Sequence, residues 1–493
     1  MNCGNCDLLN PPNVAICGNC GQHTQPAATE TTRHLCIAML LDPRARNSAI
    51  NAILHDTFRA IAHSPGVDLA TVLKYALLAQ RRQRIRDATL AAITITILAV
   101  FGFSLPLLLV LSALVVFLEL YYTYEVIIFP KLTRSFFDPA DAPLPKSTEM
   151  CDRLNDIAKR DSGNVTVFAG YSPFIGHGGK ISNWSFSMNV AKAENDAQVV
   201  PFTAGQLYDR VAAEIRALGL PGLTVEDRLF VNGLDLRDEI DADLRQAVLP
   251  REQAPPVSTV STELIHRLRD DPRTRARPYL TVSVTGWEGE VVISIFLRFV
   301  LLAEKGLLFT EAHYSLLPPL RDAYRAADRI ANRTSSRRQI WIAGQALART
   351  FGALLFALPG TVNTLAARGR NMRLRKEAVK AIEGHTFNYG AAHNPREHAT
   401  DHRYHRYFQQ LDKEMYVKAA EQRIMDALTE FLVEHNVDVS ALLERQTTIL
   451  NNGIFVTGQG QINSDSVAAG TGAVARAEHL IGQARSAAQR GSK

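Results

Sequence analysis

The chain has 493 residues, 46% of them hydrophobic and 21% charged, with a formal net charge of +5 and an isoelectric point near 8.8. Its length allows two to four domains. Its mean hydropathy of -0.05 argues against a polytopic transporter and for a soluble protein with a small membrane insert. The basic excess does not indicate nucleic-acid binding. The basic residues cluster beside apolar stretches, where contact with anionic lipid headgroups is the more common role.

Two Cys-x-x-Cys pairs open the chain: Cys3-Gly-Asn-Cys6 and Cys17-Gly-Asn-Cys20. Four thiolates at this spacing predict a closed tetrahedral zinc site, which is structural because no coordination position stays open. A rubredoxin-like iron site is the alternative, but its longer loop and aromatic packing are missing. The first thirty residues hold no apolar signal segment, so we expect a reducing compartment. Residues 1–22 resemble the short zinc ribbons at the N-termini of many bacterial membrane and regulatory proteins, which implies a protein-binding module. The remainder resembles no characterised family.

Residues 33–87 predict a helical hairpin. Apolar residues recur at helical spacing in its first half, and Ser64-Pro-Gly66 interrupts them. Asp68 is a candidate N-cap for the second helix, which ends in a basic run from Arg81 to Arg86. The preceding segment, from Gln25 to Thr32, is expected to be a polar linker.

The longest apolar stretch runs from Ala88 to Phe129 and carries only two formal charges, Glu119 and Glu125. Its helical length of roughly 63 Å is about twice the hydrocarbon core of a bilayer. Gly102 and Pro106 interrupt the middle, so residues 88–129 predict two transmembrane helices joined by a tight turn. Basic residues flank both ends and place both termini in the cytoplasm. The Glu119 carboxylate either faces the partner helix or reaches toward the membrane surface, or it forms a proton or ion site.

Residues 147–335 have the pattern of a cytoplasmic α+β domain with a mainly antiparallel sheet. Its β-branched and aromatic residues alternate as expected for strands, and a helix is expected from Gly205 to Leu218. The last two strands should form a hairpin through Glu304-Lys-Gly306. The predicted strands are Val165–Phe168, Trp184–Val190, Leu280–Val284, Val291–Leu302 and Leu307–Tyr314.

The segment from Gly170 to Ser182 is rich in glycine and follows a predicted strand, as a phosphate-binding loop does. The P-loop pattern fails, because Phe174 stands where a glycine is needed and Ile181 where Ser or Thr is needed. We therefore expect a long hairpin loop. It is still the most ligand-like loop of the chain, with Tyr171, His177, Lys180 and Trp184 within or next to it.

Residues 336–376 predict an amphipathic helix, and residues 340–358 are a second apolar stretch. Basic residues flank both ends and give no preferred orientation. We expect this helix to lie on the membrane surface. A third membrane span is the alternative, and it would place the C-terminal region outside the cytoplasm.

Residues 377–450 predict a C-terminal helical region, and residues 385–407 hold five histidines. The spacing of His398, His402 and His405 could place three imidazoles on one helical face, as a metal site requires. Interleaved arginines and tyrosines favour a solvated interaction segment instead. The tail, residues 451–493, is rich in Gly, Ser and Asn, and it either forms a small β-ladder between copies or is disordered.

The sequence contains no nucleophile elbow, HExxH motif or dinucleotide fingerprint, so it gives no catalytic residue. The leading hypothesis is a membrane-anchored cytoplasmic zinc-ribbon protein of the inner membrane that acts as a scaffold, adaptor or sensor. Its partners would be membrane lipids and proteins, with self-association as a further hypothesis and nucleic acid not expected. The alternatives are a tethered ligand-binding or enzymatic α+β domain, and an oligomeric membrane effector or channel.

Overall fold

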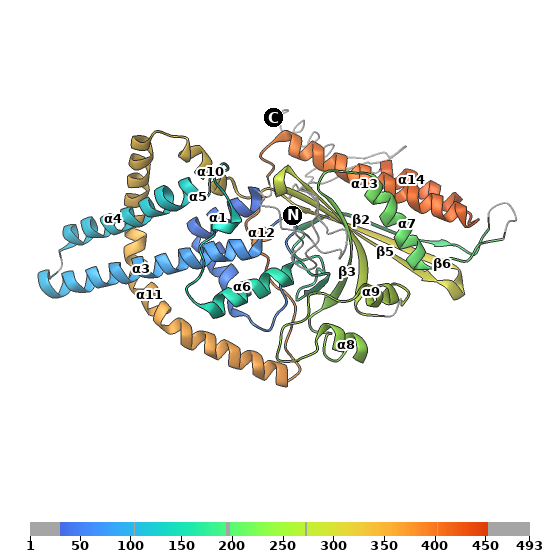
Figure 1. Cartoon of the computed structure of the whole chain (residues 1–493), viewed down its shortest axis with the longest axis horizontal. Coiled ribbons are helices and arrows are strands. Elements are labelled where there is room, and N and C mark those ends of the chain that lie inside the picture. The colour runs from blue at the N-terminus through green and yellow to red at the C-terminus, as the bar shows by residue number, and fades with distance from the viewer. Residues whose placement is uncertain (1–29, 103, 194–197, 272–273, 402, 452–493) are drawn as a thin grey trace, which may run out of the picture.

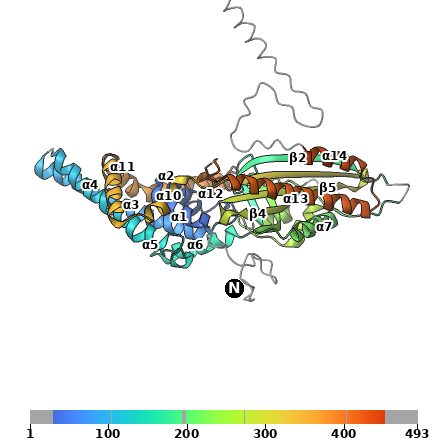
Figure 2. The same ribbon diagram turned by 90° about the horizontal axis from the view of Figure 1, so that it is seen from above.

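In the computed structural model the chain forms a helical body and a sheet body that lie side by side along the long axis (Figure 1). The structure describes residues 30–102, 104–193, 198–271, 274–401 and 403–451. Their many helices and their six-stranded mixed, mostly antiparallel sheet confirm the expected α+β class. The hairpin of α3 (Leu69–Phe101) and α4 (Leu105–Tyr121) and the sheet lie at opposite ends of the molecule (Figure 2).

The helical body is built around α1 (Glu30–Leu41), whose residues from Thr31 to Leu40 are all buried. The predicted polar linker up to Thr32 is therefore wrong at its end, where the helix has already begun. The Asp68 N-cap is confirmed, because its carboxylate accepts a hydrogen bond from the Thr71 N–H at 3.1 Å. The other elements are α2 (Pro43–Ala49), η1 (Ile50–His55), η2 (Tyr122–Ile128), α5 (Phe129–Lys131), η3 (Pro139–Asp141), α6 (Thr148–Asp161) and α10 (Asp322–Ala331).

The apolar hairpin is partly protein core. Helix α3 runs without a break from the helical body into the apolar stretch, whereas Val116, Leu120 and Ile128 of the second limb are buried in the helical body. The limb of α3 that protrudes, from Ala88 onward, is therefore shorter than a predicted span. Two helical segments among the described residues are long and apolar enough to cross a membrane: Leu105–Lys131 and Ser335–Glu383.

The second of these segments is α11 (Ser335–Glu383), a 49-residue helix with Pro359 inside it. It crosses both α3 and α4 at the base of the hairpin (Figure 1). Gly360 permits this close crossing, because a Cβ at this position would lie 2.8 Å from an oxygen of the Asp87 carboxylate. The hairpin and α11 are thus held in one fixed arrangement.

The sheet has the strand order β1-β3-β4-β5-β6-β2. Strand β1 (Val165–Phe168) pairs in parallel with β3 (Leu223–Asn232), with Val165 opposite Leu229. The neighbours that follow are antiparallel. The other strands are β4 (Arg277–Gly286), β5 (Val291–Leu302), β6 (Leu307–Leu317) and β2 (Gly179–Asn189).

Helices cover one face of this sheet. The apolar side chains of β2, β4, β5 and β6 pack against α7 (Ala204–Ala217), α13 (Tyr407–Glu434) and α14 (Ser440–Asn451) in a single core. A second core joins β1 and β3 to α8 (Ala242–Val248) and α9 (Thr262–Arg269). On the opposite face, Phe174 stacks on Phe296 with ring centroids 3.9 Å apart.

The structure confirms the predicted bounds of β1 and β5 and the hairpin of β5 and β6, whose turn is η5 (Ala303–Lys305). The long hairpin loop after β1 is wrong, because β1 and β2 lie at opposite edges of the sheet. The segment from Ala169 to Gly178 instead passes from one edge to the other, which alternation within single strands cannot reveal. Residues 452–493, for which a β-ladder between copies or disorder was expected, lie outside the described residues.

Candidate functional site

A cavity of about 700 Å³ lies against the glycine-rich segment that follows β1. Small-molecule sites commonly measure about 300–1,000 Å³. One wall is the segment from Ala169 to Ile181, and the others are the end of β6 and residues 391–404. Of the four side chains highlighted by the sequence, only Lys180 lines the cavity, whereas Tyr171 is exposed to solvent and His177 is buried.

The fourth side chain, Trp184, is directed to the other side of the sheet. Its indole N–H donates to the Tyr314 hydroxyl at 2.9 Å and to the Glu421 carboxylate of α13 at 3.2 Å. Trp184 also packs against the core beneath α13. It therefore fixes α13 on the sheet and plays no part in the cavity.

The carboxylate of Glu397 already occupies the N–H donors of the glycine-rich segment. Its Oε1 atom accepts from the N–H of Gly176 at 2.8 Å and of Gly178 at 2.9 Å. Both glycines have positive φ, and a Cβ would lie 1.9 Å from the His63 carbonyl and 2.1 Å from the Leu316 carbonyl, respectively. Burial raises the pKa of Glu397, although the two backbone hydrogen bonds act to lower it. The N–H groups of this segment thus bind a carboxylate of the same chain, that of Glu397.

Glu397 belongs to α12 (Pro395–His398), which together with Asn394 we call the α12 latch. Asn394 caps the helix and donates to the Ser64 hydroxyl of the helical body at 2.7 Å. The fully buried Arg396 donates to the carbonyls of Glu290 at 2.9 Å and Pro318 at 2.8 Å in the sheet body. The latch therefore ties the cavity wall to both bodies.

The sequence predicted this part of the chain as a solvated segment, which is wrong for Asn394 and Arg396, because both are fully buried. A signal was present: Asn followed by Pro is a typical start of a helix, with the amide as N-cap and Pro at the first helical position. The partners of the latch could not be predicted, because they come from distant parts of the chain.

The alternative of a histidine metal site finds no support in the described residues. The His398 ring packs on His393 with centroids 4.0 Å apart, whereas His405 Nε2 lies 2.8 Å from the Leu320 carbonyl oxygen. No group of three His, Cys, Asp or Glu side chains in the described part of the chain could hold a metal ion. His402 lies outside the described residues.

A serine–histidine pair is buried behind the glycine-rich segment. His177 Nδ1 lies 2.8 Å from the Ser294 hydroxyl, and both side chains are inaccessible to solvent. Burial lowers the pKa of His177 well below its ordinary value. A nucleophile and its base must reach a substrate, and neither residue lines the cavity. We therefore assign the pair to the packing of the sheet face.

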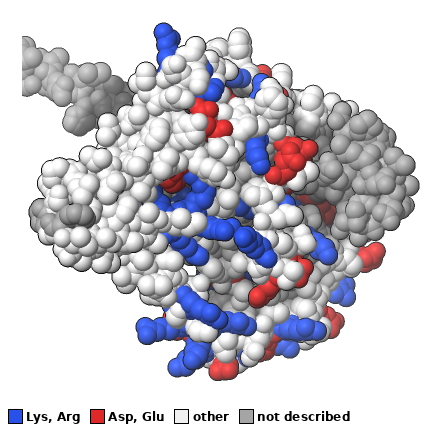
Figure 3. All heavy atoms as spheres, turned by 60° about the vertical axis from the view of Figure 1, so that its left-hand side comes forward, with Lys and Arg blue, Asp and Glu red and all other residues white. Residues whose placement is uncertain are grey.

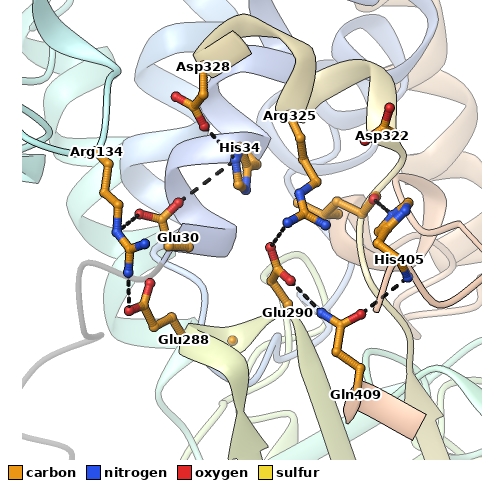
Figure 4. Close-up of polar contacts among 12 residues, drawn as sticks. Glu30, His34, Arg134, Glu288, Glu290, Asp322, Arg325, Asp328, His405 and Gln409 are labelled. Atoms are coloured by element: carbon orange, nitrogen blue, oxygen red, sulfur yellow. Dashed lines mark hydrogen bonds and ion pairs between the residues drawn. The ribbon is translucent and has the colours of Figure 1, made fainter. Parts of the chain in front are cut away.

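A second cavity, of about 570 Å³, is a charged cleft between the two bodies (Figure 4). On the side of the helical body, the buried Arg33 donates to both oxygens of Asp328 at 2.7 Å and to the Leu132 carbonyl at 2.8 Å. Burial acts to raise the pKa of Asp328, but hydrogen bonds from His34 and Arg33 outweigh it and lower the pKa well below its ordinary value.

The other side of the charged cleft is the turn between β4 and β5, which contains η4 (Trp287–Gly289). Glu290 binds Arg325 of α10 at 3.1 Å and Gln409 of α13 at 2.6 Å. Trp287 and Glu288 both have a φ of 54°, which is uncommon for residues other than glycine. The acids of the cleft are matched by bases, so we interpret it as a joint between the bodies.

The molecule also carries a large exposed apolar surface. Figure 3 shows an uncharged lobe, with Lys and Arg side chains gathered beside and below it. On α3 and α4, Val100 and Val110 are each 66% exposed, and on α11 Leu365 is 79% exposed. Other exposed apolar residues are Ile95, Leu98, Leu105, Leu114 and Leu118 of the hairpin, and Leu347, Phe351, Leu355, Phe356, Leu358 and Val362 of α11.

The two carboxylates of the apolar stretch are paired. Glu119 lies 3.5 Å from Arg82 and 3.8 Å from Arg86 of α3, and Glu125 forms a two-pronged pair with Arg338 of α11 at 3.0 and 3.1 Å. These contacts support the hypothesis that Glu119 faces its partner helix. They give no support to an open proton or ion site.

The proposed zinc ligands Cys3, Cys6, Cys17 and Cys20 lie outside the described residues, so the metal site stays a prediction. The resemblance to a zinc-ribbon family is wrong, because no such family is found. No curated protein and no solved structure matches the chain. A family model described as an AbeC-like domain matches residues 183–464, more than half of the chain. The match includes α11 and the α12 latch and leaves out the hairpin. The expectation that the remainder resembles no family is therefore also wrong, and the chain belongs to the AbeC-like domain family.

Proposed function

We propose that the protein attaches to a membrane through the α3–α4 hairpin and α11 and presents its sheet body to protein partners as a scaffold, adaptor or sensor. The observation that carries this proposal is the set of exposed apolar side chains on the hairpin and α11. Figure 3 shows an uncharged lobe beside a group of basic side chains. Apolar patches of this kind mark membrane or protein interaction sites, and flanking arginines favour anionic lipid headgroups.

The geometry favours insertion from one side of the membrane. The protruding limb of α3, from Ala88 to Phe101, has 14 residues, or roughly 21 Å of helix, less than the ~30 Å hydrocarbon core. Because α11 crosses both limbs at their base, it would lie along the membrane surface when the hairpin points into the bilayer. Both ends of the chain then stay on one side, which we propose is the cytoplasmic face of the inner membrane.

Flotation with lipid vesicles tests the proposal. The purified full-length protein should float with vesicles, and the double variant Val100→Asp/Val110→Asp should not, because a charge in the hydrocarbon core costs about 2.5–3.5 kcal/mol. The variant Val200→Asp is the control, because it places the same charge on an exposed valine of the sheet body. Recovery of the wild-type protein as a soluble monomer after cell lysis would contradict the proposal.

Ligand binding by the sheet body is a second candidate function, and the 700 Å³ cavity beside Lys180 and Glu397 supports it. A thermal-shift screen of nucleotides and small anionic metabolites on the full-length protein would test it. A true ligand should lose its effect in Lys180→Ala but keep it in Lys305→Ala, which removes a lysine from the distant turn of β5 and β6. A screen in which no compound raises the melting temperature would count against this function.

A further inference from the structure

A third cavity, of about 240 Å³, lies where the hairpin leaves the helical body. Three elements meet there: η1 supplies Asn51 and His55, α3 supplies Arg84, and α11 supplies Asn363, Arg370 and Asn371. Most of the other lining side chains are also uncharged amides or hydroxyls. This volume is below that of most drug-sized ligand sites, so it fits a small polar group.

The charges around this cavity point to an anion. Within the described residues, neither Arg84 nor Arg370 forms an ion pair with a carboxylate, although they line one small cavity from two helices. The nearby acid, Asp87, is already bound by Arg86 through hydrogen bonds of 3.0 and 2.7 Å. His55 lies 3.3 Å from the Asn371 amide. Two guanidinium groups and several amide donors are the groups that bind a phosphate and its hydroxyls.

The position of the cavity favours a lipid as the source of that anion. Ala88, the first residue of the protruding apolar limb, follows Asp87 directly, and both Asp87 and Gly360 line the cavity. Ile85 and Leu365, which adjoin lining residues in sequence, are 57% and 79% exposed. A phosphate bound here would therefore have apolar side chains beside it, where acyl chains could lie.

We propose that this cavity binds the phosphodiester headgroup of an anionic phospholipid, with Arg84 and Arg370 as the phosphate ligands and Asn51, Asn363 and Asn371 as partners of the headgroup hydroxyls. This inference rests on the proposed membrane association. It adds a defined headgroup site to the general attraction of the flanking arginines for anionic lipids. The site would also fix how deeply the hairpin enters the bilayer, because a bound headgroup would hold the base of the hairpin at the level of the headgroup layer.

The test compares flotation of the full-length protein with phosphatidylcholine vesicles that contain or lack phosphatidylglycerol. We expect the wild type to prefer the anionic vesicles and Arg84→Gln/Arg370→Gln to bind them roughly 30-fold less tightly, since each arginine near the surface contributes about 1 kcal/mol, or about fivefold. The matched control, Arg373→Gln/Arg375→Gln, removes the same charge from exposed residues of α11 that do not line the cavity. The control pair should lose clearly less affinity than the cavity pair if the cavity is the site, because neither of its side chains would touch the phosphate.

A second variant fills the cavity without changing the charge. Asn363→Phe replaces an exposed lining residue of α11 and should reduce the preference for anionic vesicles while binding to phosphatidylcholine is retained. Equal losses in the two arginine pairs, or a wild-type preference in Asn363→Phe, would overturn the inference. If the wild type binds neither kind of vesicle, the proposed membrane association itself fails.

The anion in the cavity could also come from a soluble phosphate ester, and glycerol phosphate is the probe that tests this source. In detergent, short-chain phosphatidylglycerol should raise the melting temperature of the wild type more than glycerol phosphate does at the same concentration. A larger rise with glycerol phosphate would overturn the lipid assignment.

Discussion

Replacement of Glu397 tests whether its carboxylate holds the glycine-rich segment in place or only lies beside the cavity. Its Oε1 atom alone accepts the hydrogen bonds from Gly176 and Gly178. Glu397→Ala removes this acceptor and leaves two backbone N–H groups in a partly closed site. A hydrogen bond to a charged group contributes about 1.5–3 kcal/mol. Because both bonds share one oxygen, we expect a total local loss of about 2–4 kcal/mol.

Glu397→Gln should behave differently. The amide oxygen of glutamine can accept the same two hydrogen bonds, and burial, which raises the pKa of Glu397, makes a charge at this position costly. We therefore expect Glu397→Gln to cost less than about 1 kcal/mol, as for a neutral hydrogen bond that is retained.

Hydrogen exchange followed by mass spectrometry measures this effect locally. In Glu397→Ala, peptides that contain Gly176 and Gly178 should exchange roughly 30-fold to several hundred-fold faster, which corresponds to 2–4 kcal/mol. Peptides from α7 should be unchanged, because α7 packs on the other face of the sheet. Unchanged exchange at the two glycines in Glu397→Ala would refute the role of the α12 latch in holding this segment.

Three further predictions concern other parts of the chain. Gly360→Ala should lower the stability of the detergent-solubilised protein by about 1–3 kcal/mol in thermal unfolding, because its Cβ would press on Asp87 at the helix crossing. Gly369→Ala in the same helix, with open space around its Cβ, should be neutral or stabilising. Asp328→Asn should cost about 1–2 kcal/mol at neutral pH, a modest value because the carboxylate is partly exposed. Elemental analysis should find one zinc per chain, and it should be lost when Cys3, Cys6, Cys17 and Cys20 are replaced by serine.

Each of these predictions has a clear contrary result. Equal stability losses in Gly360→Ala and Gly369→Ala would mean that α11 does not cross α3 closely. The pKa of Asp328 is lowered, so its stabilisation is present above its ordinary pKa of 3.8 and is lost as the pH falls below it. The gap between the wild type and Asp328→Asn should therefore shrink in acid, and a gap that widens would contradict the ion pair. A purified protein without zinc would end the metal prediction.

The sequence was sufficient where the evidence is local. Alternation predicted β5 from Val291 to Leu302 and its hairpin with β6, and Asp68 was predicted as an N-cap from its residue type and position. The sequence was insufficient for the order of the strands in the sheet, which depends on contacts between distant segments. The segment after β1 was expected to be a hairpin loop, because nothing in its own residues shows that β2 pairs with β6.

The apolar stretch shows a different limit. Hydropathy cannot separate a side chain in contact with lipid from one in a protein core, so Val116 and Leu120 were assigned to a membrane span although they pack within the helical body. The face of α11 was easier to predict, since Leu347, Phe351 and Leu365 recur at helical spacing and are all exposed.

The cavity wall was predicted in part. The glycine-rich segment and Lys180 were identified from composition, whereas no pattern in the sequence identified Glu397 as part of the wall. Its true partners, the N–H groups of Gly176 and Gly178, lie more than 200 residues earlier in the chain. Contacts of this kind depend on the tertiary fold and leave no local pattern.

The most direct test of the membrane proposal is the depth of the hairpin in a bilayer. Leu98→Trp places a fluorophore on an exposed position near the end of α3, and Val200→Trp places one on the sheet body. Both are compared with the wild type in vesicles whose acyl chains carry bromine, which quenches tryptophan on contact. We predict strong additional quenching for Leu98→Trp and none for Val200→Trp. Equal quenching of the two variants, or none in either, would contradict the insertion of the hairpin into the membrane.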